Sequence, residues 1–119
     1  MMQLNEYPQA IAKLQRQILK LDQTVLGLQD TLAILSLEIE KQIVADASLS
    51  NDTKRKAKRL DLQQSDLDYA KTAIDLKTAQ FERERLDIEL HLLRNQFSLL
   101  KLEARREIAV MELQASSAA

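Results

Sequence analysis

The spacing of apolar residues near the N-terminus constrains the fold of this chain more than any other feature. From Leu4 to Ile39 these residues recur alternately every three and every four positions. They are Leu4, Tyr7, Ile11, Leu14, Ile18, Leu21, Val25, Leu28, Leu32, Leu35 and Ile39. This alternation places an apolar stripe along one side of a helix, as in the heptad repeat of a coiled coil. Because Pro8 suits the first turn of a helix, the prediction is a first helix over about residues 7–44.

The alternation fails after Ile39, and a segment of small polar residues follows. Ser50, Asn51 and Asp52 are each good N-cap residues, since their side chains accept hydrogen bonds from the free N–H groups at the start of a helix. The sequence therefore predicts a turn at about 45–51. A connection this short makes the two long helices that it joins antiparallel neighbours.

The second helix, predicted over about 52–114, carries two apolar stripes. One repeats every seven residues and comprises Leu60, Leu67, Ile74, Phe81, Ile88, Asn95, Leu102 and Ala109. The other follows the later half of the helix and comprises Leu86, Leu90, Leu93, Phe97, Leu100, Ala104, Ile108 and Met111. The stripes lie on different faces, so a single partner helix cannot cover both. The tail, 115–119, is low in complexity and is expected to fray.

These elements predict an all-α fold, a single domain over 1–119 that forms a long antiparallel helical hairpin of the coiled-coil type. A hairpin folded near residue 48 leaves Leu92–Leu113 beyond the reach of the first helix, at 1.5 Å per residue. Exposed apolar surface of this kind marks an interface. We therefore expect a homo-oligomer in which two hairpins form a four-helix bundle, with a dimer as the first choice and a tetramer as the second. The alternative is an intrachain stripe that is simply wide.

Candidate interface residues come from both helices. They are Leu92, Leu93, Phe97, Leu99, Leu100 and Leu102 in the second helix, and Leu19 and Leu26 in the first. Asn95 occupies a place where the seven-residue repeat calls for an apolar residue. A polar residue in such a stripe can set the register of helix pairing at some cost in stability. The alternative is that Asn95 only reaches solvent at the edge of the stripe.

A run of cations near the turn is the strongest charge feature. Five of the six residues from Lys54 to Arg59 are basic: Lys54, Arg55, Lys56, Lys58 and Arg59. They fall in the first turns of a helix, where the helix dipole disfavours positive charge. One interpretation is a phosphate-binding site for nucleic acid or another polyanion, and a nuclear-localisation signal is another. The alternative is that Glu38, Glu40 and Asp46, across the turn, neutralise the run.

Catalytic and metal-binding patterns are missing from the sequence. There is no cysteine, and His91 is the one histidine, with Asp87 four residues before it. A lone histidine among charged residues usually lies on a solvated face, so we expect no metal site and no cofactor. The sequence has no glycine-rich phosphate loop, no zinc-binding helix motif and no nucleophile elbow. We therefore expect a protein that is not an enzyme and has no small-molecule substrate.

The chain carries a net charge of −1 and no apolar run of the length that a membrane span needs. It has no pattern of a secretory signal, so the expected location is the cytoplasm, away from membranes. The architecture resembles that of small helical-hairpin proteins, including prefoldin-like chaperones, flagellar and secretion-export chaperones, phage scaffolding proteins and phage host-nuclease inhibitors. Because a heptad pattern is common to all coiled coils, this resemblance concerns the fold alone.

The function expected from these features is self-association and protein binding, as an adaptor, scaffold or accessory subunit whose protein partner the sequence does not identify. One alternative is a nucleic-acid accessory protein, as found in phages or mobile elements, that contacts phosphates through the basic run. The other alternative is an export or assembly chaperone, whose apolar faces are covered only by its client.

Overall fold

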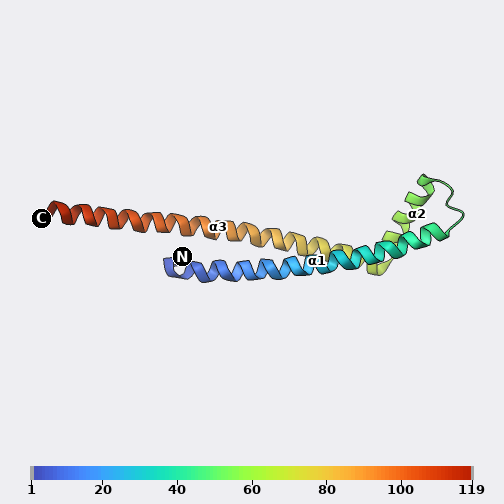
Figure 1. Ribbon diagram of the computed structural model, residues 1–119, viewed down its shortest axis with the longest axis horizontal. Coiled ribbons are helices and arrows are strands. Elements are labelled where there is room, and N and C mark those ends of the chain that lie inside the picture. Colours follow the sequence, from blue (N-terminus) through green and yellow to red (C-terminus); the bar gives the residue numbers. More distant parts are fainter. Residues whose placement is uncertain (1, 119) are drawn as a thin grey trace. The chain divides into compact units, whose positions relative to one another are not determined.

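A computed structural model describes residues 2–118, and within this range every regular element is a helix. A short 3-10 helix, η1 (Leu4–Glu6), precedes α1 (Tyr7–Ala45), α2 (Asp52–Ser65) and α3 (Leu67–Ala118) (Figure 1). The all-helical class predicted from the sequence is confirmed. None of the helices in the described range combines the length and apolarity that a membrane crossing requires.

Residues 46–51, within the segment predicted as a turn, connect α1 to α2. The carboxylate of Asp46 accepts hydrogen bonds from the backbone N–H of Ser48 at 3.0 Å and from its hydroxyl at 2.6 Å. The side chain of Asn51 accepts a hydrogen bond from the backbone N–H of Lys54 at 2.9 Å, which caps the start of α2. Local hydrogen bonds of these small polar side chains therefore shape the connection.

The chain groups into two units, each of which contains part of α1 and part of α3. In the first unit, residues 2–19 and 84–118, the ring of Tyr7 stacks on that of Phe97, with centroids 5.5 Å apart and planes 5° from parallel. The Tyr7 hydroxyl also donates to the side-chain oxygen of Gln96 at 3.4 Å. Tyr7 is only 1% exposed, and Ile18, Leu86 and Leu90 are the other buried residues of this unit.

The second unit, Lys20–Arg83, contains the rest of α1 and α3 together with α2. Its buried apolar residues are Ile39, Ile43 and Ala79. Two ion pairs connect α1 to the returning chain: Arg59 of α2 with Glu40, and Arg83 of α3 with Asp22, whose atoms are 2.9 Å apart. Exposed charged groups at the edge of an apolar contact stabilise a pairing only modestly.

The structure divides the predicted second helix at Asp66. Asp66 adopts an extended backbone conformation, with φ −77° and ψ 110°, and its carboxylate accepts hydrogen bonds from the backbone N–H groups of Asp68 and Tyr69 at 3.0 and 3.1 Å. Asp66 thus ends α2 and provides the N-cap interaction for α3. The prediction of one uninterrupted helix over 52–114 missed this break. The structure also continues α3 to Ala118, beyond the predicted start of the frayed tail.

The break at Asp66 lies in a stretch of the second unit where the two paired segments contain different numbers of residues. Asp22 and Glu40 are 18 residues apart in α1, whereas their partners Arg83 and Arg59 are 24 residues apart in the returning chain. Six extra residues correspond to about 9 Å of helix, which a straight neighbouring helix could not accommodate. Figure 1 shows α2 inclined to α1.

The start of α1 therefore contacts a later part of α3 than the sequence predicted. For a hairpin with two straight helices of equal reach, the prediction was that the start of α1 lies beside about position 90 of α3. The part of α3 from Leu92 onward would then extend beyond α1. The contact between Tyr7 and Phe97 shows that the overhang begins later. After Ala104, every α3 residue whose side chain the structure describes is exposed.

Replacing Asp66 with alanine tests whether its side chain stabilises the start of α3. We expect Asp66→Ala to lower the free energy of unfolding by about 1 kcal/mol, because the N–H groups of Asp68 and Tyr69 lose their acceptor. Urea unfolding followed by circular dichroism measures this change. Asp75→Ala, which removes an exposed carboxylate of α3 beyond its first two turns, is the matched control and should have an effect within about 0.5 kcal/mol. Equal effects of the two substitutions would contradict the capping role.

Candidate interaction surfaces

The later part of α3 has two apolar stripes, and only one of them packs within the chain. The inner stripe is defined here as Leu86, Leu90, Leu93, Phe97, Leu100 and Ala104, all of them buried or half-buried. The outer stripe is defined as Ile88, Leu92, Asn95, Leu99, Leu102, Arg106, Ala109 and Leu113, all of them exposed. At 100° per residue, the two stripes lie roughly 160° apart around the helix axis.

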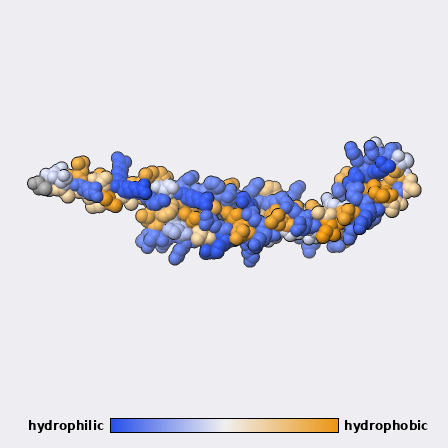
Figure 2. Space-filling view, in the orientation of Figure 1, coloured by the Kyte–Doolittle hydropathy of each residue, from blue (hydrophilic) through white to orange (hydrophobic). Residues whose placement is uncertain are grey.

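The seven-residue repeat that the sequence displays most regularly is the exposed one. Leu67, Ile74 and Phe81 continue it through the N-terminal part of α3, and each is more than 60% exposed. Figure 2 shows apolar side chains at the surface along the C-terminal part of α3. Single exposed apolar residues are ordinary, but a heptad row of them is typical of an interface.

The predicted interface residues divide between the two stripes of α3 and a face of α1. Leu92, Leu99 and Leu102 belong to the outer stripe, and each is more than half exposed. Leu93, Phe97 and Leu100 belong to the inner stripe and are half-buried. Leu19 and Leu26 are exposed on α1. The structure therefore separates Phe97, which stacks on Tyr7, from the leucines predicted to act with it.

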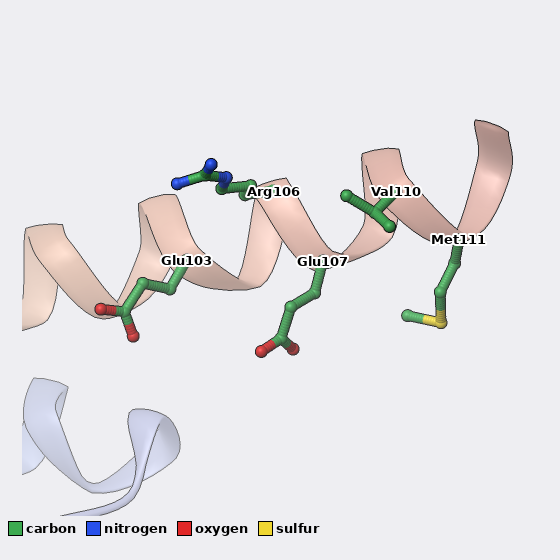
Figure 3. A pocket seen from close by; sticks show the side chains of 5 residues that line it. All are labelled: Glu103, Arg106, Glu107, Val110 and Met111. Atoms are coloured by element: carbon green, nitrogen blue, oxygen red, sulfur yellow. The ribbon is translucent and has the colours of Figure 1, made fainter. Parts of the chain in front are cut away.

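Two polar residues interrupt the outer stripe. Asn95 is exposed at the position predicted from the seven-residue repeat, and Arg106 occupies a second polar position that the sequence analysis did not single out. Figure 3 shows the side chain of Arg106 extending away from the start of α1, whereas the side chains of Glu103 and Glu107 extend from α3 in another direction. The four-residue step from Leu102 to Arg106 was the signal in the sequence that could have placed this arginine in the stripe.

The basic run is largely paired with acidic side chains. Arg59 donates two hydrogen bonds to the carboxylate of Glu40, the one from its Nη2 at 3.1 Å. Arg55 lies 3.1 Å from Asp52, and Lys58 lies 4.0 Å from Asp61. Neutralisation therefore involves Glu40, as the sequence suggested, together with Asp52 and Asp61 of α2 itself.

The remaining two cations of the run, Lys54 and Lys56, are exposed, and neither forms an ion pair within residues 2–118. The ammonium of Lys54 lies 3.4 Å from the hydroxyl of Ser50. Asp46 is engaged with Ser48, which lowers the pKa of its carboxyl, and the charge of Lys58 contributes in the same direction. Only Lys54 and Lys56 thus keep the unpaired positive charge on which the phosphate-binding hypothesis relied.

Potential metal ligands do not gather in the part of the chain that the structure describes. No cluster of three or more potential metal ligands occurs within residues 2–118. His91 is exposed, with its Nδ1 2.8 Å from the carbonyl oxygen of Asp87 and 3.6 Å from that residue's carboxylate. A hollow lined by Glu103, Arg106, Glu107, Val110 and Met111 lies on the surface of α3 alone (Figure 3). Because one helix supplies all five lining residues, no second wall encloses a ligand.

Comparisons with known proteins find no relative of the chain. No protein-family model, no curated protein and no solved structure matches it.

The pH dependence of stability tests the Glu40–Arg59 pair. The hydrogen bond from Arg59 lowers the pKa of the Glu40 carboxyl from its ordinary value of 4.5; desolvation opposes this shift and the charge of Arg59 adds to it. Because the folded-state pKa is the lower one, the pair stabilises the fold above about pH 4.5, and this contribution disappears as the pH falls through the folded-state value.

We therefore expect acidification from neutral pH to below about 4 to destabilise the natural protein more than Glu40→Gln. Urea unfolding midpoints at both pH values provide the measurement. Glu38→Gln, which changes an exposed carboxylate with no ion pair in the described chain, should retain the pH dependence of the natural protein. The ion pair would have no stabilising role if Glu40→Gln and Glu38→Gln behaved alike.

Proposed function

We propose that this protein is an antiparallel helical hairpin of the coiled-coil type that self-associates and acts by binding other proteins, as an adaptor, scaffold or accessory subunit. The order of the contacts supports the antiparallel arrangement. In the first unit Tyr7 contacts Phe97, and in the second unit Asp22 contacts Arg83 and Glu40 contacts Arg59. Later residues of α1 thus meet earlier residues of the returning chain.

The observation that carries self-association is the exposed outer stripe of α3. Its leucines and isoleucine follow the same alternating spacing as the stripe that packs within the chain. Removing one such side chain from water contributes about 1.5–3 kcal/mol. Several of them in a row are therefore sufficient to hold two helices together against the entropy lost on association.

The position of the outer stripe favours a dimer built directly on α3. In a closed four-helix bundle each helix contacts two neighbours, through faces about a quarter of a turn apart. The inner and outer stripes are roughly 160° apart, which suits a helix placed between partners on opposite sides. The dimer expected from the sequence therefore remains our proposal, with α3 against α3 as its main contact.

Placing charge on the outer stripe tests this proposal. We expect the natural chain, of 13.6 kDa, to form a discrete dimer, and the double variant Leu92→Glu with Leu99→Glu to be monomeric. Losing two buried leucines and burying two carboxylates should raise the dissociation constant at least about 100-fold. Light scattering after size-exclusion chromatography measures the mass, and circular dichroism should show that the helices persist.

A control variant with the same change in net charge separates the stripe from general electrostatics. Gln80→Glu with Arg94→Gln alters two exposed residues of α3 that belong to neither stripe, and this variant should remain dimeric. A natural chain that is monomeric at micromolar concentration would contradict self-association. It would favour the chaperone alternative, in which a client segment covers the apolar stripe.

Phosphate binding through the start of α2 is a second candidate, favoured by the exposure of Lys54 and Lys56 without acidic partners. If it operates, binding to labelled DNA or RNA should weaken steeply with salt, and Lys54→Glu with Lys56→Glu should abolish it. Lys13→Glu with Lys20→Glu is the charge-matched control on α1 and should retain binding. Absence of binding at low salt would eliminate this candidate while leaving self-association intact.

A further inference from the structure

The two polar residues of the outer stripe restrict how a second copy can pack on it. This inference rests on the proposed self-association through the stripe. The stripe has eight positions from Ile88 to Leu113, of which Asn95 and Arg106 are polar, and all eight are exposed. In a helix pair each position faces a position of the partner, so the arrangement decides which residues Asn95 and Arg106 must meet.

A parallel, in-register pair brings each residue against its own copy. Asn95 would meet Asn95, which two amides tolerate because each can donate and accept. Arg106 would meet Arg106, however, and a guanidinium has five donors and no acceptor. Two like charges would then be confined within an apolar contact, which costs free energy.

An antiparallel pair has one register in which apolar residues of the stripe face apolar residues and polar residues face polar residues. With Ile88 facing Leu113 of the second copy, Leu92 faces Ala109, Asn95 faces Arg106, and Leu99 faces Leu102. The same four layers repeat on the other side of the two-fold axis. Every apolar residue of the stripe then meets an apolar residue, and each arginine meets a side-chain oxygen that can accept its hydrogen bond.

The two neighbouring antiparallel registers lose this match. A shift of one heptad in one direction places Asn95 against Leu99 and Arg106 against Ile88. A shift in the other direction places Asn95 against Leu113 and Arg106 against Leu102. Both leave polar groups facing apolar side chains, at about 1–3 kcal/mol for each unsatisfied group.

Residues beside the stripe are compatible with the matched register as well. Glu112 would face His91, Gln96 would face Glu103, and Ser98 would face Arg105. None of these flanking pairs joins like charges, which would oppose association.

We infer that two copies of this chain pair antiparallel through the outer stripes of α3, with Asn95 of each copy accepting a hydrogen bond from Arg106 of the other. The symmetric pair contains two such contacts, and the register centres between Leu100 and Lys101. The partner for this face of the chain is therefore a second copy of the same segment, in a single orientation.

Cysteine cross-linking tests orientation and register, since the chain has no cysteine of its own. Leu92→Cys and Ala109→Cys are prepared as separate single variants, unfolded and refolded together, and oxidised. We expect a disulfide-linked dimer from the mixture and little from either variant alone. A mixture of Leu92→Cys with Leu102→Cys, which would meet in a neighbouring register, should cross-link at least about tenfold less.

The mass of each sample, measured by light scattering before oxidation, distinguishes the two levels of the proposal. Monomers would overturn self-association itself. Dimers in which each single variant cross-links with itself would overturn only the antiparallel orientation, and preferential cross-linking through Leu102→Cys would overturn only the register. Dimers that cross-link in none of these samples would place the contact outside the outer stripe.

A double-mutant cycle tests the polar contact between the copies. Asn95→Leu and Arg106→Leu should each raise the dimer dissociation constant about tenfold, because each leaves one polar partner unsatisfied. The double variant should bind about as tightly as the natural chain, since the layer becomes apolar on both sides. The two residues are eleven positions apart, about 16 Å along one helix, so coupling between them arises across the dimer. Additive effects would overturn the pairing of Asn95 with Arg106.

Discussion

The limited width of a helix–helix contact governs this molecule. One helix packed against another buries a stripe along one side, and the opposite side faces solvent unless a third element covers it. Between Leu86 and Leu102, α3 has apolar residues on both sides, and only those of the inner stripe are buried or half-buried. The chain thus buries one face of α3 against its own residues and leaves the other exposed.

The ion pairs lie at the edges of the intrachain apolar contact, and they add to its stability without taking the place of the apolar residues. Arg59 with Glu40 and Arg83 with Asp22 bridge α1 and the returning chain beside residues that are already partly removed from water. Arg59 is the last cation of the basic run, and it pairs with Glu40. Arg55 and Lys58 lie beside Asp52 and Asp61, so three of the five charges that suggested a polyanion site have a structural explanation.

Sequence periodicity predicted the helical class and the side of α1 that is protected from solvent, since the residues from Tyr7 to Ile39 at alternating spacing are buried or half-buried. It could not decide which stripe of the second helix faces α1, because both have helical periodicity and similar apolarity. The break at Asp66 was also missed. Asp66 is compatible with a helix interior and with a cap, and only the hydrogen bonds that its carboxylate accepts from the backbone N–H groups of Asp68 and Tyr69 distinguish the two. Without the break, a hairpin with equal arms placed the start of α1 too early along α3.

The polar residues of the outer stripe bear on specificity more than on affinity. A stripe of leucine alone would associate strongly, but it would accept parallel and antiparallel partners in several registers. Asn95 and Arg106 each weaken the apolar contact, and they lie at equal distances on opposite sides of the centre of the stripe, so that few arrangements bring polar side chains together. A polar group that finds a polar partner in one pairing and faces apolar side chains in the others favours the first pairing, because it raises the free energy of the others. In the dimer that we propose, the exposed face of α3 therefore combines the apolar surface that would drive association with polar residues that would limit it to one geometry.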